Sequence, residues 1–135
     1  PEMQAVAGLA APPLFTPVVD GYYSGMLVTL PLHAGLLAAP YRSKEALAAL
    51  LADYYKDEAL IHVHEAGGAP ADGTIGAGGF AGREDLEIFV LGNDAQFLLA
   101  ARFDNLGKGA SGAAVQCMNL MLGREETAGL IYKNH

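Results

Sequence analysis

The chain has 135 residues, of which 52 % are hydrophobic and 17 % are charged. This composition excludes a disordered chain, and the length suits one domain with a buried core. Eight Lys and Arg against fifteen Asp and Glu give a net charge of −7 without any basic cluster, which makes nucleic acid and anionic membranes unfavourable partners. The charged share is low for a small monomer, so we expect part of the apolar surface to contact another domain or subunit.

Three features of the sequence bear on its origin and compartment. The single cysteine, Cys117, excludes an intrachain disulfide and favours a reducing cytoplasm. The sequence shows neither a signal-peptide pattern nor an apolar stretch of about 20 residues that would predict a membrane span. It opens at Pro1 without an initiator Met, in a pattern typical of the first turn of a helix, and we interpret it as a piece trimmed or cleaved from a longer protein.

The first half of the chain predicts alternating helical and extended segments. A short helix over residues 2–9 should end near Gly8, and residues 14–19 predict an extended sheet edge, because Pro17 cannot donate to a ladder. Residues 25–33 predict a strand that is apolar on both faces and should therefore lie in a covered sheet. A helix over residues 43–55 follows, capped by Ser43, and its apolar residues recur at helical spacing: Leu47, Leu50, Leu51 and Tyr54.

The next segments predict a strand, a loop and a hairpin. Residues 60–64 alternate like a strand, and residues 66–82 are the least structured part by composition. Residues 85–91 and 96–103 predict an antiparallel hairpin around Gly92-Asn93-Asp94.

A helix is predicted over residues 110–122, ending at Gly123, with Val115, Met118 and Leu122 on one face. The order of elements predicts an α+β fold, in which a mostly antiparallel sheet carries helices on one face. We expect residues 1–135 to form a single domain.

Three patterns could carry chemistry, but a structural interpretation is favoured for each. The segment 76–81 (GAGGFA) matches the dinucleotide-binding pattern G-x-G-x-x-A, yet no strand precedes it and no helix follows it, which favours a flexible strand edge or a loop. His62 and His64 alternate on one strand face without a third ligand nearby, which favours surface or interface histidines over a metal site. His33 ends a strand as a lone histidine, which favours a packed or exposed role. Cys117 lies about two turns into a helix, beyond helix-dipole activation, so a packed or interface thiol is favoured.

The best candidate site is the turn Asp104-Asn105-Leu106-Gly107-Lys108-Gly109, which leaves a strand and opens a helix. Free N–H groups at the start of a helix attract anions, glycines let a ligand approach the backbone, and Lys108 adds a positive charge. The alternative is a plain strand-to-helix connection, in which the glycines serve the turn and Ser111 caps the helix. The residues alone leave both interpretations open.

This turn, together with the segments 114–123 (AVQCMNLMLG) and 126–130 (ETAGL), resembles the C-terminal signature of N-acetyl-gamma-glutamyl-phosphate reductases. The segments 1–3 (PEM), 15–17 (FTP) and 25–29 (GMLVT) resemble the opening of that family's second domain. The resemblance covers nearly the whole chain. It implies the substrate-side, oligomer-forming domain of a two-domain reductase of the glyceraldehyde-phosphate-dehydrogenase type, without its nucleotide-binding domain.

The resemblance also implies a reaction: NADPH reduces N-acetyl-gamma-glutamyl phosphate to the semialdehyde and phosphate in arginine biosynthesis. The family's catalytic cysteine and histidine lie outside this chain, so no catalytic residue is expected here. By position, Asn105 corresponds to the residue that approaches the nicotinamide of NADP(H), and Lys108 is a weaker candidate for cofactor or phosphate binding. The implied partners are the nucleotide-binding domain, a second copy bound through the sheet, and the acyl phosphate.

The chain departs from the family at two places. The family has Asn where this chain has Cys117, which argues against a catalytic thiol there. Gly76-Ala77-Gly78 lies where Gly-Ser-Asn is expected, which weakens any substrate contact at that strand. Two other functions stay open: a stand-alone self-associating domain, and a sister reductase that acts on an amino-adipyl phosphate in lysine synthesis.

Overall fold

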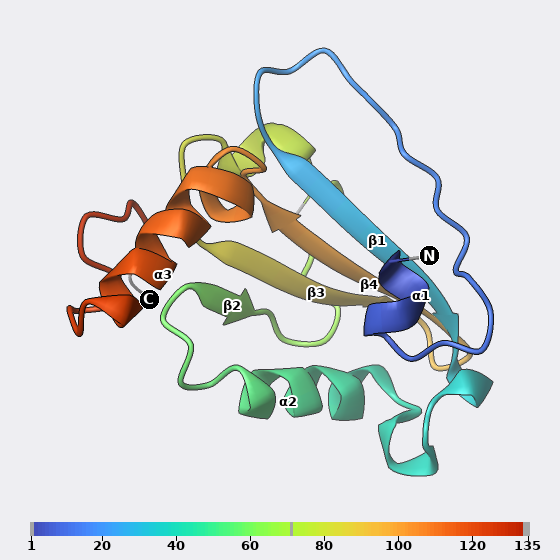
Figure 1. The fold of residues 1–135 in the computed structure, drawn as a ribbon. Coiled ribbons are helices and arrows are strands. Elements are labelled where there is room, and N and C mark those ends of the chain that lie inside the picture. Colours follow the sequence, from blue (N-terminus) through green and yellow to red (C-terminus); the bar gives the residue numbers. More distant parts are fainter. Residues whose placement is uncertain (1, 71, 134–135) are drawn as a thin grey trace.

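The computed structural model describes residues 2–70 and 72–133 and has an α+β fold (Figure 1). Its four-stranded sheet has the order β1-β4-β3-β2. β1 and β3 both pair antiparallel with β4, and β2 pairs parallel with β3, so the predicted mostly antiparallel sheet is confirmed. The strands are β1 Met26–His33, β2 Ile61–Val63, β3 Leu86–Gly92 and β4 Gln96–Phe103.

Three α-helices and several short turns complete the described chain. The helices are α1 Glu2–Val6, α2 Lys44–Tyr54 and α3 Gly112–Met121, and the short turns are η1 Ala34–Leu36, η2 Ala39–Tyr41, η3 Ala77–Phe80 and the π-turn η4 Gly107–Ser111. The predicted helices at residues 2–9, 43–55 and 110–122 are thus confirmed, although α3 begins later than expected. The predicted role of Pro1 lies outside the described residues. No helix among the described residues is long and apolar enough to cross a membrane.

The β3–β4 hairpin forms where the turn residues predict it. Gly92 has a φ of +99°, and a Cβ at this position would lie 2.2 Å from the carbonyl oxygen of Gln96, so only glycine fits. The Oδ1 atom of Asn93 accepts hydrogen bonds from the backbone N–H groups of Ala95 and Gln96. The turn therefore fixes the register that places Glu87 opposite Arg102.

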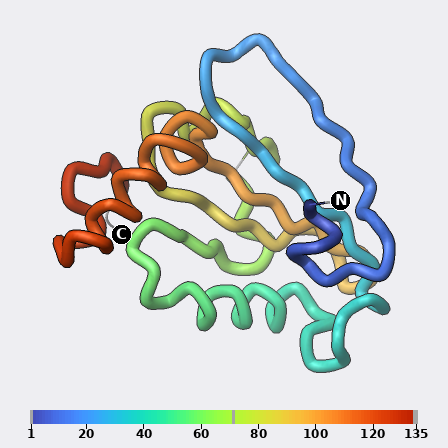
Figure 2. The backbone as a smooth tube through the Cα atoms, in the orientation of Figure 1, coloured from blue at the N-terminus to red at the C-terminus, as the bar shows by residue number. Residues whose placement is uncertain are grey.

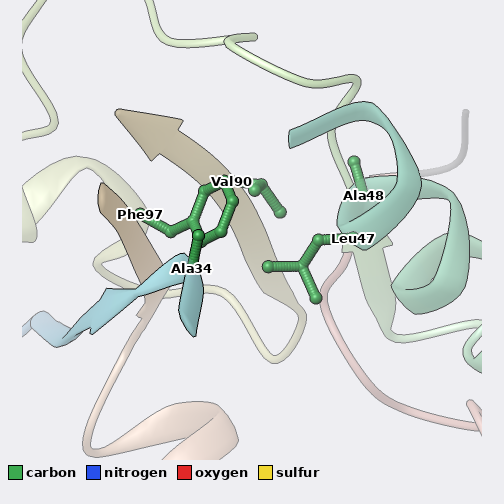
Figure 3. Packing of buried hydrophobic residues seen from close by; sticks show 5 residues of the cluster. All are labelled: Ala34, Leu47, Ala48, Val90 and Phe97. Carbon is green, nitrogen blue, oxygen red and sulfur yellow. The ribbon is translucent and has the colours of Figure 1, made fainter. Parts of the chain in front are cut away.

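The hydrophobic core lies between α2 and one face of the sheet (Figure 3). Ser43 caps α2 as predicted, because its Oγ accepts a hydrogen bond from the N–H of Ala46 at 3.2 Å. Leu47 and Ala48 pack with residues of the sheet and of η1: Ala34, Val90 and Phe97. Leu50 and Tyr54, which share the predicted apolar spacing, are exposed because they lie outside this contact.

The expected sheet edge at residues 14–19 is wrong. This segment forms no strand and runs as a wide arc between α1 and β1 (Figure 2). Pro12, Pro13 and Pro17 remove three backbone donors, so the segment cannot build a continuous ladder against β1. Its apolar side chains, including those of Leu14 and Val19, are almost fully exposed.

A strand and a helix of the described chain also expose apolar faces. On β1, Met26, Val28 and Leu30 alternate along one face and are between 40 % and 51 % exposed, so the expectation of a covered strand is not met within this chain. On α3, the predicted face that carries Met118 and Leu122 is also exposed, together with other large side chains of the helix, Leu120 and Met121. The residues that α3 buries are instead Gly112 and Asn119.

Candidate functional site

The candidate site is built around the buried carboxylate of Asp104, at the end of β4. Its Oδ2 atom accepts hydrogen bonds from the Ser24 hydroxyl, at 3.1 Å, and from the Gly82 N–H, at 2.5 Å. Its Oδ1 atom accepts from the N–H groups of Leu106, at 2.8 Å, and Gly107, at 3.3 Å. Three chain segments therefore meet here, and we call Ser24–Gly25, Gly82 and residues 104–107 together the Asp104 junction.

The electrostatics of the junction favour an ionised Asp104. Burial raises the pKa of its carboxyl group, but the hydrogen bonds from Gly82, Leu106, Gly107 and Ser24 outweigh burial and hold the pKa below its ordinary value. The charge has no ion-pair partner among the described residues. Neutral donors alone stabilise it, so the geometry of the junction depends on their positions.

Asn105, the first predicted site residue, belongs to this junction and is half-buried. Its Oδ1 atom accepts a hydrogen bond from the Gly25 N–H at 2.8 Å, whereas its Nδ2 atom donates no hydrogen bond to the described residues. Gly25 has a φ of +122°, and a Cβ there would lie 2.4 Å from the carbonyl oxygen of Ala77, so this position requires glycine. The amide donor of Asn105 is thus not bonded to the described chain, and its acceptor is already used once.

Lys108, the second predicted site residue, lies in η4, and its hydrogen bond goes to a different element. Its Nζ donates to the Oε1 of Gln116 on α3 at 2.8 Å, and the Nε2 of Gln116 donates in turn to Glu126. Burial lowers the pKa of Lys108, although the negative charge of Glu126 acts in the opposite direction. No hydrogen bond joins Lys108 to Asn105 within the described chain, so the two side chains are held by different hydrogen-bond partners.

The backbone of the turn is not an open cradle of free donors. The N–H groups of Leu106 and Gly107 bond to Asp104 Oδ1, and those of Gly109 and Ser111 bond to the carbonyls of Asp104 and Leu106. Ser111 does not cap α3, which was part of the structural alternative, because its hydroxyl donates to the Leu106 carbonyl at 2.7 Å. These internal bonds favour the interpretation of the backbone as a strand-to-helix connection.

The glycine-rich segment lies against the junction as a short turn. Residues 77–80 form η3 between irregular segments, so the G-x-G-x-x-A match has neither the strand nor the helix of a dinucleotide site, and the loop interpretation is confirmed. The Gly76 carbonyl accepts a hydrogen bond from Arg102, and the guanidinium of Arg102 lies over the Phe80 ring, 4.9 Å from its centroid.

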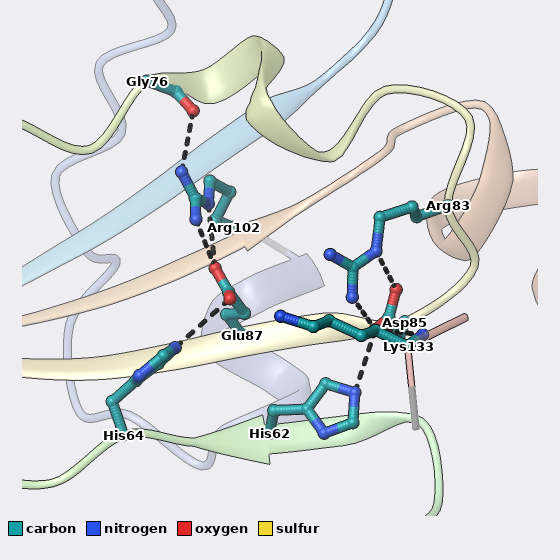
Figure 4. A network of polar contacts seen from close by, with 8 residues as sticks. All are labelled: His62, His64, Gly76, Arg83, Asp85, Glu87, Arg102 and Lys133. Atoms are coloured by element: carbon teal, nitrogen blue, oxygen red, sulfur yellow. Dashed lines mark hydrogen bonds and ion pairs between the residues drawn. The ribbon is translucent and has the colours of Figure 1, made fainter. Parts of the chain in front are cut away.

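A network of charged side chains occupies the sheet face opposite α2 (Figure 4). The Nε2 atom of His62 lies 2.9 Å from Asp85 Oδ2, and Asp85 also pairs with Arg83. Burial raises the pKa of Asp85, but its hydrogen bonds to Arg83 and to the Lys133 N–H outweigh burial, so the pKa lies below its ordinary value.

The second histidine contacts a second carboxylate. His64 Nε2 lies 3.2 Å from Glu87 Oε1 without hydrogen-bond geometry, and the Nε of Arg102 donates to Glu87 Oε2 at 3.0 Å. His64 also stacks on Phe89, with ring centroids 4.4 Å apart. His62 and His64 are half-buried, and each lies against an acidic partner that the sequence did not indicate. Their expected interface role stays a prediction. The described residues contain no group of three or more side chains that could hold a metal ion.

The remaining candidate residues lie apart from the junction. Cys117 is an exposed free thiol on α3, and His33 is exposed at the end of β1. Neither side chain forms a hydrogen bond or ion pair within the described chain. Exposure is one of the two roles favoured for His33, whereas Cys117 is not packed within this chain and its expected interface role stays a prediction.

Comparison with known proteins gives matches along almost the whole chain, although no family model matches it. It is 45 % identical to N-acetyl-gamma-glutamyl-phosphate reductase 2 of a Nostoc species, and 44 % and 42 % identical to the N-acetyl-gamma-glutamyl-phosphate reductases of Trichormus variabilis and Burkholderia cenocepacia. The matches cover 96 %, 96 % and 95 % of the chain. The chain is similar to one part of these reductases. This confirms the resemblance predicted from its motifs, and the chain spans 41 % of the length of each of the three reductases.

The sequence motif locates the turn but not the residues that support it. Asp104 was recognised only as part of the motif, and Ser24 and Gly82 were not singled out at all. Ser24 lies 80 residues from Asp104, and its neighbours carry no pattern that links it to the turn. The one signal available was the position of Asp104 at the end of a buried strand, because a carboxylate that becomes buried there needs hydrogen-bond donors.

Proposed function

We propose that this chain is the C-terminal, substrate-side and oligomer-forming domain of an NADPH-dependent N-acetyl-gamma-glutamyl-phosphate reductase. The whole protein would reduce the acyl phosphate to N-acetylglutamate semialdehyde and release phosphate, a step of arginine biosynthesis. The observation that carries the proposal is the identity of 42–45 % along 95–96 % of the chain to proteins of that name. Because the chain spans 41 % of their length, the nucleophile and most of the cofactor site would lie in the rest of the protein.

The Asp104 junction fits a role at the nicotinamide end of NADP(H). A carboxamide offers a carbonyl acceptor and an NH₂ donor group, and Asn105 has an amide donor group that is not bonded to the described residues. Its Oδ1 atom, already bonded to Gly25, keeps a second lone pair for a ligand donor. NADP(H) would supply the hydride when bound, while Asn105 would orient the ring and Lys108 would add a positive charge beside the turn.

The two exposed apolar surfaces fit two different partners in this proposal. The stripe of Met26, Val28 and Leu30 on β1 would be covered by a second copy, so that the oligomer forms through the sheet. The face of α3 that carries Met118 and Leu122 starts beside the cofactor turn, so it would contact the nucleotide-binding domain. Both surfaces consist of large apolar side chains, whose burial drives association in water.

The function is tested with the full-length protein. Purified protein should oxidise NADPH only when N-acetyl-gamma-glutamyl phosphate is supplied, and far more slowly with the amino-adipyl phosphate of the sister reductase. The 135-residue chain alone should show neither this activity nor tight NADPH binding. Absence of activity with the full-length protein and both acyl phosphates would refute the proposed function.

The assignment of Asn105 has its own test in the same assay. Asn105→Ala should lower kcat/KM by a factor on the order of 10–100, which corresponds to the loss of one or two oriented hydrogen bonds. Cys117→Ser is the matched control and should keep full turnover, because its thiol is exposed on α3 and is not expected to react. Full activity of the Asn105 variant would refute a role of Asn105 in cofactor binding and would show that the turn is a structural connection.

A further inference from the structure

We infer that Asp104 is a positioning residue, which sets the orientation of Asn105 without itself touching the cofactor. This inference rests on the proposed function. Asp104 is 3 % exposed and each of its two carboxylate oxygen atoms accepts two hydrogen bonds from the protein, so it is not open to a ligand. Its effect on the cofactor must therefore pass through the residues that it holds.

The route of this effect is a double link between two dipeptides that are 80 residues apart. Asp104 Oδ2 accepts from the Ser24 hydroxyl, and Asn105 Oδ1 accepts from the N–H of the next residue, Gly25. The first link fixes the position of Ser24, and hence the direction of the Gly25 N–H. That N–H in turn holds the amide of Asn105 in one of its two flipped orientations, with the Nδ2 donor facing away from Gly25.

The hydrogen-bond donors of the junction fit a carboxylate at position 104 but not an amide. Each oxygen of Asp104 receives at least one backbone N–H, from Gly82 on Oδ2 and from Leu106 and Gly107 on Oδ1. An asparagine would have to turn its NH₂ group toward one of these sets of N–H donors, whichever way the amide is flipped. Asp104→Asn therefore disturbs the junction in either orientation, although it preserves the size of the side chain.

Ser24 offers a milder perturbation of the same link. Ser24→Ala removes one of the four donors to Asp104 and leaves the three backbone donors in place. It should loosen the entry to β1 without breaking the turn after β4. The two variants form a graded pair, with Asp94→Asn as the control, because Asp94 is exposed in the hairpin turn.

The experiment measures NADPH binding and steady-state kinetics of the full-length protein. Dissociation constants come from NADPH fluorescence titration, and KM values are determined separately for NADPH and for the acyl phosphate. Asp104→Asn should weaken NADPH binding on the order of 10-fold, and Ser24→Ala by a smaller factor. Asp94→Asn should match the wild type, and KM for the acyl phosphate should change little in all three variants.

A double-mutant cycle separates positioning from general structural support. If Asp104 acts through Asn105, then adding Asp104→Asn to Asn105→Ala should weaken NADPH binding no further than Asn105→Ala alone. Additive losses would overturn the inference, as would unchanged NADPH binding in a folded Asp104→Asn protein. If Asp104→Asn does not fold, Ser24→Ala with Asn105→Ala completes the same cycle, and an additive result there overturns it equally.

Failure of the proposed function has a different signature. A wild-type protein that binds NADPH but reduces no acyl phosphate would refute the reductase assignment alone, and the binding cycle would still decide the role of Asp104. A full-length wild type that binds no NADPH would overturn both.

Discussion

Replacing Arg102 by methionine should destabilise the fold strongly, because it leaves the carboxylate of Glu87 buried without its main partner. Glu87 is 9 % exposed, and the Nε of Arg102 donates to its Oε2 at 3.0 Å. His64 Nε2 lies 3.2 Å away but lacks hydrogen-bond geometry, so it replaces this bond poorly. Methionine keeps the length of the side chain but removes the guanidinium, which also lies over the Phe80 ring and donates to the Gly76 carbonyl. The double variant described below separates the ion pair from these contacts.

The magnitude follows from the burial of the pair. Breaking a buried ion pair by removal of one partner costs about 3–5 kcal/mol, whereas an exposed pair contributes about 0–1 kcal/mol. Both side chains of the Arg102–Glu87 pair are nearly buried, at 15 % and 12 % exposed, so we expect a loss of about 3 kcal/mol for Arg102→Met. The Lys56–Asp53 pair, at 62 % and 78 % exposed, is the matched control, and Lys56→Met should cost less than about 1 kcal/mol.

Urea unfolding followed by circular dichroism measures these differences on the purified chain. The double variant Arg102→Met with Glu87→Gln should recover a large part of the loss, because it removes the unpaired charge together with its partner. If Arg102→Met lowers the free energy of unfolding by less than about 1 kcal/mol, as the Lys56 control does, the expected effect of burial is refuted. The Arg102–Glu87 pair would then behave like an exposed, solvent-screened ion pair.

Three further outcomes follow from the charged groups and the exposed surfaces. The pKa values of Asp85 and Asp104 are lowered in the folded state, so the stability that these groups contribute is complete above the pKa of unfolded aspartate. The free energy of unfolding, measured by denaturant titration at a series of pH values, should therefore decrease as the pH falls below about 4, and it should decrease less in Asp104→Asn. Lys108→Met should leave the melting temperature unchanged or slightly raised, because burial already disfavours the charged ammonium, yet it should weaken NADPH binding by the full-length protein if Lys108 contacts the phosphate. Light scattering should show the purified chain as a dimer or larger at high micromolar concentration, since β1 and α3 expose large apolar side chains, and a clean 14.0 kDa monomer would contradict this.

The sequence by itself determined the elements whose signals are local. Asn93 and Gly92 encode the hairpin turn, and Ser43 begins α2, because turn and cap residues act on backbone groups only a few positions away. The motif from Asp104 to Gly109 also located the candidate site and the reductase resemblance. All of these predictions depend on interactions within a short stretch of chain.

The tertiary structure decided which faces are buried and which side chains support the site. It left residues 14–19 out of the sheet, exposed the apolar faces of β1 and α3, and gave His62 and His64 their acidic partners. It also brought Ser24 to Asp104 across 80 residues. The physical reason is that hydrogen bonds to a buried carboxylate depend on where distant segments meet in space. Periodicity and turn preferences are local, so they do not indicate which distant segments come together.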